Sequence, residues 1–275
     1  MSKSEFPLGF VVYKPDLSSV ARISDVLDAG YEVYLFDNSP QCPEIRTRFL
    51  NRPNLHYSTV GSNVGLGYGI SAVCAEAYYR GSEWLLFLDQ DTVYTARTLD
   101  YINTYVRKQR EALAAYSGAT FCQDRCLAWN PDMPPERVLL TINSGTIYRL
   151  EVLSKIGWMN VDYFVDCVDY EYCLRSLNAR FHVGRCWNTP ELDHRRDQGN
   201  TDVFLFGKTR QLRRYPLGRI RGTVKSSMKL IVASAISMQL RFCLAISRSL
   251  VGYIFWQIVS RVLVQRSANT PHLSA

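Results

Sequence analysis

The sequence is poor in the residues that define several classes of protein. Its 16 Gly and 11 Pro among 275 residues exclude collagen-like and low-complexity architectures. Its 8 Cys are too dilute for a disulfide scaffold, and the pair Cys122 and Cys126 has no second pair or nearby His to complete a zinc site. A disordered chain is also excluded, because 47% of the residues are hydrophobic and only 21% are charged. We therefore expect a globular protein with reduced thiols, as in the cytosol.

Two further absences concern the ends of the chain. The apolar run over residues 6–13 is preceded by one Lys and followed by no small-residue cleavage site, so we expect a first strand rather than a signal peptide. No acidic residue follows Asp202. Residues 1–204 hold 20 Lys or Arg and 25 Asp or Glu, whereas residues 205–275 hold 12 Lys or Arg and no acidic residue. The whole excess of positive charge therefore lies in the last quarter of the chain, which indicates an anionic partner for that part.

Apolar and amphipathic segments alternate along the rest of the chain and predict an α/β domain. We expect strands over residues 8–13, 31–36, 55–60, 84–88, 138–142 and 181–186, and helices over residues 17–30, 43–50, 96–110 and 168–177. A Gly-rich loop over residues 61–69 precedes a further helix that ends near residue 80. This order favours a mostly parallel, doubly wound sheet, which binds ligands at the carboxyl ends of its strands. We assign residues 1–204 to this domain, with a polar loop over 188–202, and residues 205–275 to a tail of basic amphipathic helices.

Two carboxylates follow the apolar strand predicted over residues 84–88. In an extended segment, residues i and i+2 point the same way, so Asp89 and Asp91 face one point at the edge of the sheet. A divalent cation that also binds a diphosphate needs such an arrangement, with few protein oxygens and the other positions taken by phosphate and water. His194 in the polar loop could complete this site as a neutral imidazole. The alternatives are a solvated strand end and an ordinary surface His.

A second acidic group lies at the start of the helix predicted over residues 168–177. It contains Asp166, Asp169 and Glu171 beside aromatic neighbours. One interpretation is N-terminal capping, since the helix dipole favours carboxylates there. The other is a general base, because a carboxylate that Tyr163 and its neighbours shield from water has a raised pKa and suits proton abstraction.

These segments together resemble the family 2 glycosyltransferases, inverting enzymes with the GT-A fold, and among them the bacterial rhamnosyltransferases of O-antigen and related polysaccharides. The resemblance covers about residues 8–199 and is specific through the joint order and spacing of its motifs. These are Phe36-Asp37-Asn38-Ser39, Asn63-Val64-Gly65, Leu88-Asp89-Gln90-Asp91-Thr92, Asn143-Ser144-Gly145-Thr146, residues 164–175 and His194. Val168-Asp169 stands where a Glu-Asp pair is common, as in the rhamnosyltransferase-like subgroup, and Thr92 stands where that subgroup more often has Ser.

The resemblance implies a Rossmann-like nucleotide-diphospho-sugar transferase that binds its donor through four residues. Asp37 is expected to bind the nucleobase, Asn63 and Gly65 the nucleotide, and Asp89 the ribose. The favoured donor is dTDP-L-rhamnose, and the alternative is a UDP-hexose such as UDP-galactose, UDP-glucose or UDP-GlcNAc.

The resemblance also implies the chemistry. Asp169 is expected to be the catalytic base, with Asp166 and Glu171 near the acceptor, and Asp91 and His194 are expected to hold Mn²⁺ or Mg²⁺ on the diphosphate. The reaction would be one displacement at the anomeric carbon by a hydroxyl of a lipid-linked or cell-surface glycan.

The tail over residues 205–275 is strongly apolar from Leu230 onward. Its longest stretch without a charge, Ser249 to Ser260, has 12 residues, which is short of the roughly 20 that span a bilayer. Basic, aromatic-rich helices lie in the membrane interface, so we expect a cytoplasmic protein attached peripherally to the anionic inner face of the bacterial plasma membrane. The alternatives are a helical pair packed on the domain and a membrane span that tolerates Arg248.

Three other functions are disfavoured by the sequence. The basic tail is compatible with nucleic-acid binding, but its apolar face argues against this, and we expect no nucleic-acid partner. A nucleotide-sugar binder without activity is disfavoured by the joint presence of Asp91, Asp169 and His194. A nicotinamide-dependent oxidoreductase is disfavoured because the glycines over residues 65–69 are spaced G-x-G-x-G and follow the third strand.

Overall fold

The computed structural model describes residues 4–40, 47–49, 52–123, 130–194, 200–205, 208–213 and 215–268, and divides the chain into two compact units, residues 1–195 and 196–275. Cys126, most of the helix expected over 43–50 and the middle of the loop expected over 188–202 lie outside the described residues. Residues 47–49 of that helix are described and are helical.

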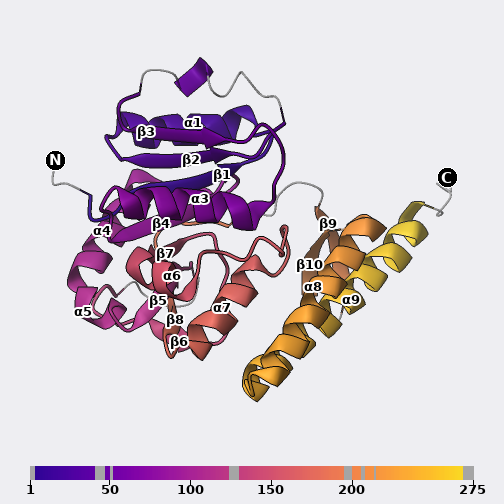
Figure 1. Ribbon diagram of the computed structural model, residues 1–275. Coiled ribbons are helices and arrows are strands. Elements are labelled where there is room, and N and C mark those ends of the chain that lie inside the picture. The colour runs from indigo at the N-terminus through magenta and orange to yellow at the C-terminus, as the bar shows by residue number, and fades with distance from the viewer. Residues whose placement is uncertain are drawn as a thin grey trace. The chain divides into compact units, whose positions relative to one another are not determined.

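The first unit is built on one mixed sheet (Figure 1). Its strands in chain order are β1 (Leu8–Val12), β2 (Val33–Asp37), β3 (Leu55–Thr59), β4 (Trp84–Asp89), β5 (Tyr116–Phe121), β6 (Glu136–Val138), β7 (Thr146–Arg149) and β8 (His182–Cys186). In space they follow the order β3-β2-β1-β4-β7-β5-β8-β6. The pairs β1–β2, β2–β3, β1–β4 and β5–β8 are parallel, and β7 and β6 are antiparallel to their neighbours. The carboxyl ends of β1 to β5 and β8 therefore lie at one edge of the sheet.

Helices cover both faces of this sheet because its strands are apolar on both sides. They are α1 (Leu17–Asp28), α3 (Leu66–Tyr79), α4 (Ala96–Lys108), α5 (Arg110–Leu113), α6 (Leu150–Ile156) and α7 (Val168–Asn178). Phe10 belongs to one core cluster with Ile23 of α1 and Ile102 of α4. Val11 points to the other face, where a Cβ on Gly69 of α3 would lie 2.7 Å from its side chain. Successive residues of β1 thus alternate between two helical layers.

Local signals explain where the helices begin. The Asp16 carboxylate accepts a hydrogen bond from Ser19 N at 2.7 Å and caps α1, and Thr95 and Thr98 form a capping box at the start of α4. The helix α3 begins at Leu66, so the second half of the Gly-rich segment is helical and not loop. A Cβ on Gly67 would lie 2.9 Å from Asn160 O, so glycine is required there by close packing and not by a turn.

The predicted mostly parallel α/β architecture is confirmed, but two strands differ from the prediction. No strand forms over residues 139–142, because the chain pairs instead through β6 before them and β7 after them. The strand β5 was not foreseen because its Tyr-Ser-Gly-Ala-Thr-Phe sequence is small and polar. That composition fits a close approach: a Cβ on Gly118 would lie 2.7 Å from the Tyr172 hydroxyl.

The second unit begins with strands and not with the helices expected from residue 205. The strands β9 (Asn200–Leu205) and β10 (Lys208–Arg213) form an antiparallel pair, so the expected loop over 188–202 ends by residue 200. Two long helices follow, α8 (Leu217–Ile236) and α9 (Leu240–Ala268), and they pack on each other (Figure 1).

A buried hydroxyl chain fixes α7 on the sheet and can be tested. Tyr172 OH donates to Ser117 Oγ at 2.7 Å, and Ser117 Oγ in turn contacts Ser176 Oγ at 2.8 Å. We predict that Tyr172→Phe lowers the free energy of unfolding by about 1–3 kcal/mol, because it leaves a buried hydrogen-bonding group without its partner. Urea unfolding followed by near-UV circular dichroism measures this, and Tyr79→Phe, at an exposed position, should have no effect. Equal stability of both variants would contradict the prediction.

Candidate active site

Two of the expected donor-binding carboxylates lie on either side of β1. Asp37 is the last residue of β2 and pairs with Val12, and Asp89 is the last residue of β4 and pairs with Val11. Because all three strands are parallel, both carboxylates reach the same carboxyl edge. Asp37 is buried, and its two oxygens accept hydrogen bonds from Ser39 N and Tyr57 OH, both at 2.9 Å. Its position is therefore fixed by the sheet itself.

The loop before α3 is held by two asparagine side chains. Asn38 Nδ2 donates to Asn63 Oδ1 at 2.8 Å, and Asn38 Oδ1 accepts from Val64 N at 2.8 Å. Asn63 Oδ1 also accepts from Gly65 N at 3.1 Å. The expected nucleotide-binding residue Asn63 is thus tied to the strand end that carries Asp37. Asn38, to which we assigned no role from the sequence, makes this connection.

Gly65 joins this loop to the acidic segment. Its φ is +90°, and a Cβ at this position would lie 2.7 Å from Phe164 O, so only glycine fits. The next residue, Leu66, donates its N–H to the same Phe164 oxygen at 2.6 Å. The backbone that leads into Asp166 and Asp169 is therefore attached directly to the expected nucleotide loop.

Asp169 lies in the first turn of α7, after Cys167 with a φ of +66°. Burial raises the pKa of Asp169 to about 7, and the nearby Asp166 carboxylate contributes to the increase. Hydrogen bonds from backbone N–H groups, including Tyr170 N at 2.9 Å, act in the opposite direction and are outweighed. A carboxyl with a pKa near neutral is suited to accept a proton at physiological pH.

Asp89 belongs to the same electrostatic cluster. Burial, together with the charges of Asp91 and Asp169, raises the pKa of Asp89 to about 7. The structure therefore brings these three predicted residues together. Asp91 is exposed and lies in the turn after β4. Ser144 supports that turn, because its Oγ contacts Asp89 N at 3.0 Å and Thr92 Oγ1 at 2.6 Å.

His194 is brought to the same turn by a short antiparallel bridge. Val93 and Asp193 exchange two backbone hydrogen bonds of 2.8 Å, so His194 lies opposite Thr92. The His194 Nε2 atom lies 3.1 Å from Phe121 O and must carry the proton of that hydrogen bond. This tautomer makes Nδ1 the acceptor nitrogen, as in metal-binding histidines whose other nitrogen donates to a carbonyl. A Cβ on Gly145, whose φ is +75°, would lie 2.8 Å from the ring.

A metal ion at this turn would need ligands from outside the protein. Within the described residues, no three His, Cys, Asp or Glu side chains form a group that could hold a metal. Asp91 and His194 offer one carboxylate and one imidazole, which fit Mn²⁺ or Mg²⁺ when diphosphate oxygens and water supply the remaining positions.

Glu171 is placed differently from the other expected site residues. It is buried, and both of its oxygens accept hydrogen bonds from Arg175 Nε, at 2.7 and 3.0 Å. Arg175 also donates to Ile156 O at 3.0 Å and Gly157 O at 2.5 Å. The Glu171 carboxylate thus takes part in an ion pair that ties α7 to the end of α6.

Gln90 has a role that the sequence did not reveal. Its side-chain Oε1 accepts from Tyr13 N at 2.7 Å, and its Nε2 donates to Tyr13 O at 3.3 Å. Arg22 of α1 donates to the Gln90 carbonyl at 2.9 Å. The residue between the two aspartates therefore holds the end of β1. In the sequence, only the long amide side chain between two carboxylates indicates this role of Gln90.

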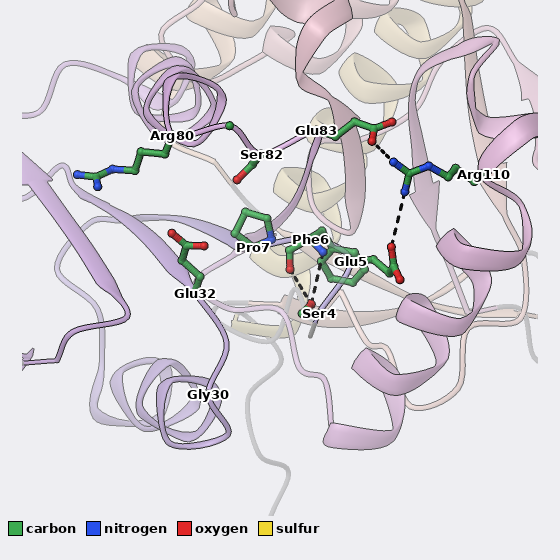
Figure 2. A pocket seen from close by; sticks show the side chains of 11 residues that line it. Ser4, Glu5, Phe6, Pro7, Gly30, Glu32, Arg80, Ser82, Glu83 and Arg110 are labelled. Atoms are coloured by element: carbon green, nitrogen blue, oxygen red, sulfur yellow. Dashed lines mark hydrogen bonds and ion pairs between the residues drawn. The ribbon is translucent and has the colours of Figure 1, made fainter. Parts of the chain in front are cut away.

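A surface groove of about 550 Å³ lies at the other edge of the sheet, at the amino ends of β1, β2 and β4. Figure 2 shows Arg110 between two of its lining carboxylates, Glu83 and Glu5. These ion pairs already satisfy the charges on that side of the groove. The groove contains none of the expected site residues, so we place the candidate site at the carboxyl edge.

The raised carboxyl pKa values have a consequence for stability. The unfolded chain has ordinary carboxyl pKa values of about 4, so between about pH 4 and pH 7 the folded protein holds more protons and its stability falls as pH rises. We predict that Asp89→Asn and Asp169→Asn each raise the free energy of unfolding at about pH 8 by on the order of 2 kcal/mol, with no gain at about pH 4. Urea unfolding at both pH values measures this, with Asp100→Asn as an exposed control. A gain that is the same at both pH values would contradict the assigned cause.

Comparisons with known proteins agree with this architecture. No protein-family model matches the chain. The chain is 24% identical over 186 residues to the dTDP-rhamnosyl transferase RfbF of Shigella flexneri, a match that covers 61% of this chain and 62% of that protein. The chain thus matches less than two thirds of the length of this curated relative.

Among solved structures, TarS of S. aureus superimposes with a TM-score of 0.51 and 15% identity, covering 68% of this chain and 36% of TarS. The TarS fragment 1–349 in complex with UDP-GlcNAc has a TM-score of 0.47, 14% identity and coverages of 66% and 56%. GalNAc-T7 with UDP, GalNAc and Mn²⁺ has a TM-score of 0.48, 11% identity and coverages of 70% and 44%. The last two scores are too low to establish a shared fold. The comparisons therefore confirm the predicted resemblance: the chain has a GT-A-like fold, shared with TarS, and is similar in sequence to a dTDP-rhamnosyl transferase.

Proposed function

We propose that the chain is an inverting glycosyltransferase that moves a sugar from a nucleoside diphosphate to an acceptor hydroxyl. The observation that carries this proposal is the grouping of Asp89, Asp91 and Asp169 at the carboxyl edge of a GT-A-like sheet. Such an edge is where α/β sheets bind their ligands. The similarity to a dTDP-rhamnosyl transferase supports the same reaction class.

The donor end of the proposed site is built from β1, β2, β4 and the loop before α3. Asp37 and Asp89, on either side of β1, would bind the base and the ribose. Asn63 and Gly65 would line the nucleotide, and the positive φ of Gly65 brings that loop against Phe164. The donor would therefore lie beside the acidic segment that carries the proposed base.

Asp169 would act as the general base. In a single displacement, the acceptor oxygen attacks the anomeric carbon and its proton passes to an Asp169 oxygen. The bond between that carbon and the diphosphate oxygen breaks, and its electron pair leaves with the nucleoside diphosphate. The pKa of about 7 leaves a substantial fraction of Asp169 ionised at neutral pH and makes it a stronger base than an ordinary carboxylate. Asp166, which lies three residues before Asp169 and precedes α7, would contact the acceptor.

Asp91 and His194 would hold a Mn²⁺ or Mg²⁺ ion. When bound, such an ion supplies positive charge that stabilises the leaving diphosphate. The protein's own contribution is to fix the turn that carries Asp91 through Ser144 and to fix the His194 tautomer through Phe121 O.

The donor we favour is dTDP-L-rhamnose, and the sequence similarity to RfbF supports it. UDP-hexoses are the alternative donors that the sequence resemblance allows. The acceptor we propose from the resemblance is a hydroxyl of a lipid-linked or cell-surface glycan.

The base assignment predicts a separation of binding from chemistry. Asp169→Asn should lower kcat by about 10²–10⁴-fold, because the amide cannot accept the acceptor proton, while the donor Kd stays within about twofold. Turnover assays and donor titration measure the two effects separately. Asp100→Asn is the matched control, being an exposed aspartate on α4. Unchanged turnover in Asp169→Asn would refute the assignment.

The donor and the metal can be identified together. We predict that dTDP-L-rhamnose with Mn²⁺ raises Tm by about 5 °C at a donor concentration of about 100 Kd, and that UDP-hexoses or donor without metal give smaller shifts. Asp91→Asn and His194→Gln should remove the part of the shift that needs Mn²⁺ and keep the remainder. A donor shift that is independent of metal in the unsubstituted protein would contradict the assigned ligands.

A further inference from the structure

The second unit ends in a hairpin of two antiparallel helices, α8 and α9. Thr223 Oγ1 lies 3.5 Å from Tyr253 OH, and Cys243 Sγ lies 3.8 Å from Ile231 O, so the two helices run past each other along their length. At the open end, Arg261 donates to Tyr215 O at 2.5 Å and joins the two segments. The inner faces of the two helices therefore contact each other, and the outer faces form the surface of the hairpin.

The outer faces of the hairpin carry large apolar side chains that are exposed. Around the turn, Ile236 is 78% exposed, Met238 77% and Leu244 70%. Val251 and Ile258 continue the exposed apolar side of α9. Exposed apolar groups gathered in this way mark an interaction surface.

Exposed positive charge accompanies these apolar groups on both helices. Lys225 and Lys229 are exposed on α8, and Arg241 and Arg248 are exposed on α9. No Asp or Glu occurs anywhere in residues 205–275. A surface that is apolar and carries only positive charge is complementary to a lipid bilayer with anionic headgroups. Its apolar side chains can contact the acyl chains, and its positive charges can pair with the lipid phosphates.

The pairing of the helices distinguishes lying on a membrane from crossing it. In the described part of the chain, one helical segment, Leu240–Arg261 with a mean hydropathy of 1.5, is long and apolar enough to cross a membrane. The contacts between Thr223 and Tyr253 and between Ile231 and Cys243 place the basic half of α8 alongside this segment. A crossing by α9 would therefore take several Lys and Arg of α8 into the hydrocarbon, at a cost of about 2.5–3.5 kcal/mol for each.

We propose that the α8–α9 hairpin is a docking surface for an anionic lipid bilayer. It lies in the plane of the interface, with the apolar side chains around its turn in the headgroup boundary and its Lys and Arg on lipid phosphates. This proposal is independent of the proposed transferase activity, because it uses no residue of the candidate active site.

Co-sedimentation of the full chain with vesicles tests the proposal. The vesicles are made of phosphatidylcholine alone or of an equal mixture of phosphatidylcholine and phosphatidylglycerol. The turn variant is Ile236→Ser with Met238→Asn, chosen because Asn tolerates the positive φ of Met238. The charge variant is Lys225→Gln with Lys229→Gln. The control is Tyr79→Ser with Met133→Ser, which removes exposed apolar side chains from the first unit.

We expect the unsubstituted chain to bind the anionic vesicles, to release at high salt, and to bind phosphatidylcholine weakly. Each Lys removed should weaken anionic binding by about fivefold, and the turn variant should weaken it by at least about tenfold. The control should bind like the unsubstituted chain. The bound protein should be extracted by alkaline carbonate, as an interfacial protein is.

Absence of vesicle binding, or undiminished binding by both hairpin variants, would overturn the proposal. Resistance to carbonate extraction, or a turn variant whose only change is loss of self-association on size exclusion, would overturn it as well. A charge variant that loses duplex DNA binding and not vesicle binding would also overturn it. The donor-dependent Tm shift, measured on the same samples, reports separately on the proposed transferase.

Discussion

The candidate site depends on one close backbone contact, between the residue pair Gly65 and Leu66 and the carbonyl of Phe164. Leu66 N donates to that oxygen at 2.6 Å, and the lack of a side chain on Gly65 makes the approach possible. The contact joins the start of α3 to the turn before α7, two segments about a hundred residues apart in the chain. It brings the helix that carries Asp169 to the strand ends that carry Asp37 and Asp89.

The contact also sets the electrostatics of the site. By bringing α7 to the end of β4, it places Asp169 close enough to Asp89 for one charge to raise the pKa of the other. Bringing carboxylates together in a partly buried place is unfavourable unless protons or cations accompany them. The folded chain therefore favours protons or cations at this edge, which is consistent with the proposed proton transfer and the proposed binding of a diphosphate with a cation.

Sequence patterns were sufficient for the parts of the fold that are locally determined. The apolar run of β4 followed by Asp89 and Asp91, and the caps of α1 and α4, depend on neighbours in the chain. The strand β5 was missed because its small residues are selected by the approach of Tyr172, which comes from a distant helix. The ion pair of Glu171 with Arg175 has the i, i+4 spacing of a helix, which is visible in the sequence. Its burial and the hydrogen bond from Arg175 to Gly157 O depend on the tertiary structure.

Asp89 and Asp169 became candidate site residues through the family resemblance of the motifs that contain them. Position alone was not sufficient, because a carboxylate at a strand end can be solvated and one in the first turn of a helix can serve in capping. Supporting residues such as Asn38 and Ser144 were present in the motifs but had no assignable role, since amide and hydroxyl groups serve equally well in turns and caps. Their function appears only when the partner, from another segment, is known.

Gln90 makes two hydrogen bonds to Tyr13 with its side-chain amide, in the manner of a peptide group in a neighbouring strand. The amide thereby continues the β1–β4 pairing past the point where the backbone of β4 turns away. Gln90 consequently couples the end of β1 to the turn that holds Asp89 and Asp91. A displacement of the β1 end would be transmitted to the two carboxylates, so the shape of the proposed donor pocket and the direction of the proposed metal-binding oxygens would change together.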